Sequence, residues 1–143
     1  MLVSQILKSK GDLVFTISPH ETVSEACRLL LERRVGAMVV VDLRDAVVGI
    51  ISERDVVRAL AEDGANALAR PVESCMTSEV IFAEPGELVD ALMSRMTDRK
   101  IRHLPVLAGG RLVGIVSIGD LVKTKIAEAE AEAQGLKAYI AGG

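Results

Sequence analysis

Two short stretches of the sequence each carry a hydroxyl and a carboxylate three residues apart. They are GIISERDVVR at 49–58, with Ser52 and Asp55, and GIVSIGDLVK at 114–123, with Ser117 and Asp120. A serine followed at this distance by an acid, just before an apolar helical run, is typical of a helix N-cap. At a helix start the same groups can also hold a phosphate and the hydroxyls of a ribose. Both interpretations stay open, and they can coexist, because a serine can cap an empty site and yield to a ligand.

Both stretches belong to a tandem repeat. Residues 14–41 align with 80–107 at an offset of 66, and beyond a one-residue deletion 49–58 aligns with 114–123 at an offset of 65. Each copy predicts a short strand, a helix, a hairpin of two strands and a second helix, which gives a mixed α/β (α+β) fold. The predicted organisation is repeat 1 at 1–60, a polar linker at 61–71, repeat 2 at 72–126 and a helical tail at 127–143.

The first helix of each copy has a start pattern and one apolar face. Ser18 and Pro19 suggest an N-cap and a first helical residue, and the stretch at 84–87 keeps the proline and an acid. The first strands are expected at about 14–17 and 80–83. Apolar residues then recur at helical spacing, as expected of core rather than a cofactor site. They are Val23, Ala26, Cys27 and Leu30 in the first copy and Val89, Leu92, Met93 and Met96 in the second.

The hairpins are β-branched and almost wholly apolar, so we expect their strands to be covered on most sides. The first contains VGAMVVV and AVVGII, and the second contains LPVL and RLVGIV around Ala108-Gly109-Gly110. One copy of about 60 residues would bury too little surface to be more than marginally stable alone. We therefore expect the two copies to pack together about a pseudo-twofold axis.

Composition narrows the class of protein. Half of the residues are apolar, only three are aromatic, and the net charge is −3, so nucleic acid is an unexpected partner. Cys27 and Cys75 are too few and too far apart for a disulfide framework or a Cys-x-x-Cys metal site, and we expect reduced core thiols and no metal. The first residues lack the pattern of a signal peptide, and no run of 18 apolar residues predicts a membrane span. A cytoplasmic, membrane-free protein is expected.

The repeat, with RRVGAMVVV, GIISERDVVR, RKIRHLPVL and GIVSIGDLVK, resembles a tandem pair of cystathionine-β-synthase (CBS) domains, the Bateman module. The resemblance covers about residues 1–125, and the chain looks like the free-standing bacterial type of CBS-pair protein. It implies a regulatory fold that binds adenine nucleotides, commonly AMP, ADP or ATP and sometimes NAD or S-adenosylmethionine, in two clefts between the paired domains. It also implies flat dimers formed through helices.

The resemblance also assigns roles to residues. Asp55 and Asp120 would accept hydrogen bonds from ribose hydroxyls, while Ser52 and Ser117 would meet the phosphate. Basic residues before the second hairpin would reach the phosphates, and these are Arg102 and His103, where the first copy has Gly36 and Ala37. We therefore expect the Asp120 site to be the better one for a charged nucleotide. Arg54, which precedes Asp55, is a candidate to compensate in the first copy, although it could equally be a solvated residue.

In proteins that this sequence resembles, adenine lies against aliphatic side chains and backbone groups near the first strand. By position the resemblance points to Ile50, Ile115 and Ile101, and to the entry segments around Asp12 and Ser78. With no Trp and a single Tyr, aromatic stacking cannot be the main contact to the base.

The sequence bears on three classes of function. A module that senses an adenine nucleotide and signals to an unidentified partner is favoured, with no required cofactor. An enzyme is disfavoured, and no catalytic residue is assigned, because GGRLVGI lacks the Lys-Ser/Thr of a P-loop and other nucleotide or hydrolase motifs are missing. A structural module with empty clefts remains the alternative, as does a binder of NAD or S-adenosylmethionine.

Association with a second chain is also expected. The second helices, in DVVRAL and DLVKTKI, keep apolar positions that one module need not cover, which favours a homodimer. The Ala/Glu-rich tail is predicted to be helical up to Gly135 and to fray beyond it. It is interpreted either as a solvated helix end or as a helix that packs on a neighbouring chain.

Overall fold

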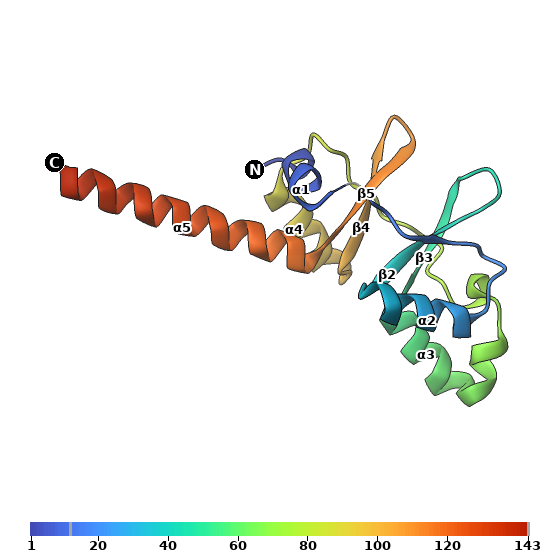
Figure 1. The fold of residues 1–143 in the computed structure, drawn as a ribbon. Helices are drawn as coiled ribbons and strands as arrows, with labels where there is room; N and C mark the ends of the chain where they lie inside the picture. Colours follow the sequence, from blue (N-terminus) through green and yellow to red (C-terminus); the bar gives the residue numbers. More distant parts are fainter. Residues whose placement is uncertain (12, 143) are drawn as a thin grey trace. The chain divides into compact units, whose positions relative to one another are not determined.

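The computed structural model describes residues 1–11 and 13–142 (Figure 1). Contacts divide the chain into two compact units. We call Leu13–Phe82 the first-repeat unit, and Met1–Asp12 with Ala83–Gly143 the second-repeat unit. The sequence predicts that the first residues belong to repeat 1, at 1–60. In the structure, however, the backbone amide of Val3 donates to the carbonyl of Glu87 at 3.0 Å, so the start of the chain packs with the second repeat.

The first-repeat unit contains a three-stranded sheet in the order β1-β2-β3. Strand β1 pairs parallel with β2, and β2 pairs antiparallel with β3. The elements are β1 (Thr16–Ile17), α2 (Val23–Arg33), β2 (Ala37–Val41), β3 (Val47–Ser52) and α3 (Glu53–Asp63), followed by the 3-10 turns η1 (Gly64–Ala69) and η2 (Val72–Ser74).

The second-repeat unit repeats the order of the first, with a helix, a two-stranded hairpin and a second helix. Its elements are α1 (Val3–Lys10), α4 (Val89–Arg99), β4 (His103–Ala108), β5 (Arg111–Ser117) and α5 (Ile118–Gly142). Gly109 and Gly110 form the hairpin turn with φ of 58° and 80°, a conformation that glycine adopts without strain. The predicted mixed fold of two repeats is therefore confirmed. The prediction that the tail frays beyond Gly135 is wrong, because α5 continues to Gly142.

The strand predicted at 80–83 is reduced to one bridge, between Ala83 and Val106. In the first-repeat unit the amide of Val39 donates to the carbonyl of Phe15 at 3.3 Å. The residue equivalent to Val39 is Pro105, which has no amide hydrogen to give. The second strand prediction was therefore wrong because one proline removes the hydrogen bond that would extend the pairing.

Both first helices begin later than predicted. Helix α2 starts at Val23, and the hydroxyl of Thr22 accepts the amide of Glu25 at 3.1 Å, while Ser18 and Pro19 lie in a preceding turn. Thr22 followed by Glu25 is itself a capping pattern, and it is the one directly before the apolar stripe. Helix α4 starts at Val89 rather than near Pro85.

The predicted apolar stripes form the cores. Val23, Ala26 and Leu30 of α2 are buried, as are Val89, Leu92 and Met96 of α4. Cys75 is buried and Cys27 half-buried, and both are free thiols. Burial raises the pKa of the Cys27 thiol, which disfavours its reactive thiolate. None of the described helices combines the length and apolar character that crossing a membrane requires.

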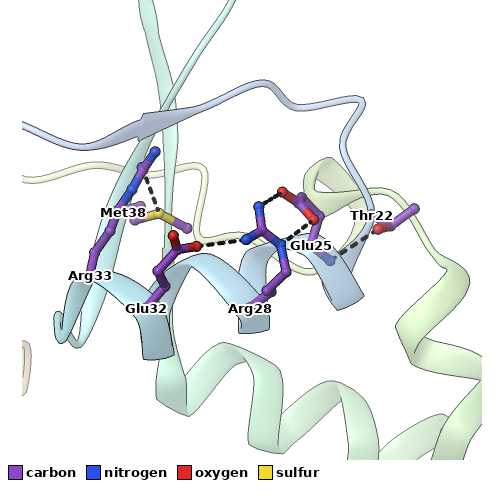
Figure 2. A network of polar contacts seen from close by, with 6 residues as sticks. All are labelled: Thr22, Glu25, Arg28, Glu32, Arg33 and Met38. Atoms are coloured by element: carbon purple, nitrogen blue, oxygen red, sulfur yellow. Dashed lines mark hydrogen bonds and ion pairs between the residues drawn. The ribbon is translucent and has the colours of Figure 1, made fainter.

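The outer face of α2 carries a polar network, shown in Figure 2. The guanidinium of Arg28 lies 2.6 Å from carboxylate oxygens of both Glu25 and Glu32, at helical spacings of three and four residues. Arg33 reaches the sulfur of Met38 at 3.8 Å and lies over the Phe15 ring at 4.6 Å from its centroid. Solvent reaches both of these Arg28 ion pairs and screens them, so we interpret this part of α2 as a solvated helix surface rather than a site.

Two equivalent glycines allow other segments to approach the hairpins closely. A Cβ at Gly49 would lie 2.5 Å from the sulfur of Met76 and 2.9 Å from the carbonyl oxygen of Thr77. A Cβ at Gly114 would lie 2.5 Å from a methyl carbon of Leu7. The obstacle at Gly49 includes backbone, whereas the one at Gly114 is only the end of a flexible side chain.

We predict that Gly49→Ala lowers the free energy of unfolding by about 1–3 kcal/mol, the usual cost of overpacking, because the Thr77 backbone must move. Gly114→Ala is the matched control and should cost less, since Leu7 can change rotamer. Urea titration followed by circular dichroism measures both. Equal effects would show that the Thr77 carbonyl is not the limiting contact.

Candidate functional site

In the first-repeat unit, the predicted serine and aspartate form the cap of α3. The amide of Asp55 donates to the Ser52 hydroxyl at 3.3 Å. In return, the Ser52 amide and hydroxyl donate to Oδ2 of Asp55 at 2.9 and 3.0 Å. This reciprocal pairing is a capping box, so the structural role of the motif is confirmed.

The other oxygen of Asp55 contacts a segment far along the chain. The hydroxyl of Thr77 donates to Oδ1 at 3.1 Å, and a guanidinium nitrogen of Arg58 lies 3.3 Å from the same oxygen. Thr77 is held in place because its backbone exchanges two hydrogen bonds of 2.9 Å with Ile50 on β3. Asp55 is only 3% exposed. A ribose at this carboxylate would have to displace Thr77 or Arg58.

In the second-repeat unit, Asp120 has a similar cap but a different neighbour. The Ser117 amide donates to Oδ2 of Asp120 at 2.8 Å, and the Asp120 amide donates to the Ser117 hydroxyl at 3.2 Å. The ammonium of Lys10, at the end of α1, lies 2.6 Å from Oδ2. It also donates to the carbonyl of Ile115 at 2.8 Å. The Asp120 side chain is 23% exposed and so is more accessible than Asp55.

These contacts set the charge of Asp120. Partial burial raises the pKa of this carboxyl, but hydrogen bonds from the Lys10 ammonium and from Ser117 outweigh it, so the pKa lies below its usual value. A carboxyl with a lowered folded-state pKa contributes stability above its unfolded pKa of about 3.9, and loses that contribution as the pH falls through the folded value. Near neutral pH, Asp120 is therefore an ionised hydrogen-bond acceptor.

The predicted basic residues lie beside Ser117. His103 opens strand β4 and is the register partner of Ser117 on β5. The carbonyl of Arg102 accepts the amide of Ile118 at 2.8 Å, which holds Arg102 at the start of α5. The side chain of Arg102 is exposed. One end of the hairpin therefore places the backbones of Arg102 and His103 beside the cap of Asp120, whose carboxylate also contacts the Lys10 ammonium.

The remaining predicted residues are placed as follows. Ile50 and Ile115 are half-buried on β3 and β5 and bond through their backbones to Thr77 and Lys10 respectively. Ile101 is half-buried, and its amide bonds to the carbonyl of Met96 at the end of α4. Arg54 is exposed in the first turn of α3. Asp12 lies outside the described residues.

Sequence reasoning missed Lys10, Thr77 and Arg58. The Arg58 contact could have been predicted from the sequence, because a basic residue three positions after Asp55 lies on the same helix face. Thr77 adjoins Ser78, one of the two predicted entry segments, and Lys10 shortly precedes Asp12, the other. Their contacts with the aspartates depend on how these segments fold back on the hairpins, which the local sequence does not specify.

A separate hollow of about 440 Å³ lies on the first-repeat unit. It is formed by the β1–α2 turn and the β2–β3 loop, and none of the predicted site residues lines it. Its lining residues are Thr16, Ile17, Ser18, Pro19, His20, Val41, Asp42, Leu43 and Arg44.

Known proteins share both the repeat and the fold. The family model for the CBS domain matches twice, at residues 11–62 and 72–126. A CBS-domain-containing protein from Agrobacterium tumefaciens is 41% identical with a TM-score of 0.85, covering 87% of this chain and 92% of its own. A CBS domain protein from Pyrobaculum aerophilum complexed with AMP is 28% identical with a TM-score of 0.75, and covers 84% of this chain and 89% of its own.

A third solved structure is the CBS domain pair of protein MJ0100 in complex with 5′-methylthioadenosine and S-adenosyl-L-methionine. It is 29% identical with a TM-score of 0.80, and covers 90% of this chain and 98% of its own. Two matches of the family model along one chain agree with the duplication seen in the sequence and with the two repeated units of the structure. The chain is a tandem CBS-domain protein and belongs to the CBS-domain family.

Proposed function

We propose that this protein is a regulatory module that binds an adenine nucleotide of the AMP, ADP or ATP class and signals its presence to a partner. In this proposal, Asp120 accepts hydrogen bonds from the ribose hydroxyls at the higher-affinity site, and Asp55 does so at a weaker one. The observation that carries the proposal is the partly exposed, ionised carboxylate of Asp120 at the start of a helix, with Arg102 and His103 beside its cap.

The ligands of the similar structures share one chemical group. AMP, 5′-methylthioadenosine and S-adenosylmethionine, named for the Pyrobaculum aerophilum and MJ0100 structures, all contain adenine linked to a ribose with free 2′ and 3′ hydroxyls. This ribose offers a pair of neighbouring hydroxyls, which can both donate hydrogen bonds to a carboxylate. The ligands differ at the 5′ position, where AMP has a phosphate. Specificity between them must therefore depend on residues other than the aspartates.

Arg102 and His103 favour the phosphate in this chain. Anions are stabilised at a helix start by the free amides and the positive end of the helix dipole. Adding an arginine gives a geometry that can bind two phosphate oxygens at once. The first-repeat unit has Gly36 and Ala37 at the equivalent positions, so it lacks these two groups. For that reason we assign the charged nucleotide to the Asp120 site.

The Lys10 contact must be exchanged when ribose binds Asp120. The two side chains are 35% and 23% exposed, and solvent-accessible ion pairs contribute about 0–1 kcal/mol. A hydrogen bond to a charged acceptor contributes about 1.5–3 kcal/mol, and a ribose can supply two. The diol therefore outcompetes the lysine. At Asp55 the contacts are buried, and the exchange is less favourable.

Substitution of the two aspartates tests their proposed contact with the ribose. Asp120→Asn, which keeps an oxygen for the Ser117 amide, should weaken AMP binding by about tenfold or more, since it removes the charge that the diol contacts. Asp55→Asn should have a smaller effect. Isothermal titration calorimetry with AMP, ADP and ATP measures both, and Asp98→Asn, an exposed site on α4, is the control variant.

The ligand supplies a second control. With 2′-deoxy-AMP, wild-type binding should weaken and Asp120→Asn should cause little further loss, because the hydroxyl and the carboxylate belong to one contact. If all nucleotides bind yet both asparagine variants bind normally, the site is wrong. If no adenine nucleotide binds but S-adenosylmethionine or NAD does, the ligand class is wrong. Binding of none of them supports the alternative of a structural module.

Substitution of Lys10 tests whether its ammonium competes with the ribose for Asp120. Lys10→Met removes the ammonium that occupies Asp120, so both adenosine and AMP should bind up to about fivefold more tightly, corresponding to the release of about 1 kcal/mol. Lys8→Met, on the same helix, is the matched control and should leave affinity unchanged. Unchanged or weaker adenosine binding in Lys10→Met would show that Lys10 does not compete with the ribose.

A further inference from the structure

Helix α5 carries an apolar stripe whose side chains remain exposed within the described part of the chain. The stripe consists of residues separated by four and three positions in alternation, and we call it the α5 stripe. Its members are Val122, Ile126, Ala129, Ala133, Leu136 and Ile140. Val122 is 42% exposed, Ile126 54%, Leu136 61% and Ile140 68%, and both alanines are exposed.

This stripe differs from the face of α5 that packs on its own unit. Leu121 is fully buried, and Lys125 lies 2.9 Å from Asp90 of α4. The α5 stripe lies about a quarter turn away on the helix, at 100° per residue. In Figure 1 the later part of α5, drawn in red, extends beyond α4 of the same unit. The exposed stripe is therefore additional to the intramolecular packing.

The spacing of the α5 stripe is that of a two-stranded coiled coil. Alternating steps of four and three average 3.5 residues, which keeps apolar side chains on one seam between two supercoiled helices. Val122, Ala129 and Leu136 take the d positions of the heptad, and Ile126, Ala133 and Ile140 take the a positions. Gly135 falls at a c position, outside the seam. We propose that α5 pairs with α5 of a second copy of this chain as a parallel coiled coil.

The charges that flank the seam favour the parallel arrangement. The e positions are Lys123, Glu130 and Lys137, and the g positions are Lys125, Glu132 and Tyr139. In a parallel pair, each g residue lies beside the e residue five positions later on the other helix. Glu132 then faces Lys137 of the second copy, and Lys125 faces Glu130. Because Lys125 also bonds to Asp90 and Glu128, the Glu132–Lys137 pair carries most of this preference.

The antiparallel arrangement brings like charges together. In the antiparallel register that overlaps the whole stripe, Ala129 lies opposite Ala133 and Leu136 opposite Ile126. Residues at e then face e, and residues at g face g. Glu130 meets Glu130, Glu132 meets Glu132, and Lys123 meets Lys137. Like-charge contacts of this kind select against a pairing. The stripe supplies attraction for a second copy, and the flanking charges set its direction.

Cysteine cross-linking tests the direction. In a parallel pair, Leu136→Cys places two identical d positions opposite each other, so a disulfide-linked dimer should form in a glutathione redox buffer. Ala131→Cys, at an f position outside the seam, is the matched control and should remain monomeric on a non-reducing gel. Cys27→Ser in both variants removes the half-buried native thiol. Equal cross-linking of the two variants overturns the proposal, as does no cross-linking of either.

Charge reversal tests the partner contact in the otherwise native chain. Lys137→Glu or Glu132→Lys alone should raise the dissociation constant of the dimer by about tenfold, because two attractive pairs become repulsive. The double variant Glu132→Lys/Lys137→Glu should restore it. Sedimentation equilibrium measures the dissociation constant. A chain that remains monomeric, or a dimer unaffected by either single reversal, overturns the proposal, whereas loss and rescue support it.

Discussion

In both repeats, the end of a strand is joined to the start of a helix by a hydrogen bond from a serine amide to an aspartate carboxylate. The bond measures 2.9 Å at Ser52 and Asp55 and 2.8 Å at Ser117 and Asp120. It satisfies an amide that the helix start leaves without a partner and fixes the direction in which the helix leaves the sheet. The same carboxylate is the group proposed to hold a ribose. Each aspartate therefore serves the fold even when no ligand is bound, and only its remaining hydrogen-bonding capacity is available to a ligand.

The duplicated motif has diverged through its neighbours rather than through its own residues. Asp55 is buried and contacts Thr77 and Arg58, whereas Asp120 is partly exposed and contacts Lys10. A threonine that is itself fixed by two backbone hydrogen bonds is hard to displace, while the ammonium at the end of a long lysine side chain can move away. Two copies of one sequence motif thus become one mainly structural carboxylate and one that is more accessible.

The sequence was sufficient to predict what depends on local patterns. The duplication, the two hairpins, the apolar helix faces and the capping role of Ser52 and Ser117 all follow from spacing, and the structure contains them. Helix starts were harder, because Ser18 and Thr22 both begin a plausible capping pattern and the choice between them depends on packing. The prediction of a strand at 80–83 was wrong for a reason that the sequence alone does not show. Pro105 prevents the pairing only because it lies opposite that segment, and this register is known only from the structure.

The motif of the candidate site could be read from the sequence, whereas the contacts of its aspartates could not. Lys10 is 110 residues from Asp120, and Thr77 is 22 residues from Asp55. No periodicity connects residues so far apart, and their proximity depends on the way the segment before each repeat folds onto a hairpin. Gly49 and Gly114 record this approach in the sequence, because a side chain at either position would collide with that segment. Their alignment in the two copies was visible, but its steric reason required the structure.

The first turn of α5 contains Asp120, and its 25 residues continue without a break to Gly142. At 1.5 Å per residue this rod is about 37 Å long, so tilting its base by one degree would sweep its tip through roughly 0.6 Å. Under the proposed function, a small shift of the cap on ribose binding would therefore move the end of α5 further than its base. A rigid helix would in this way carry a shift at its first turn to its far end, with no rearrangement of the hairpin or of α4.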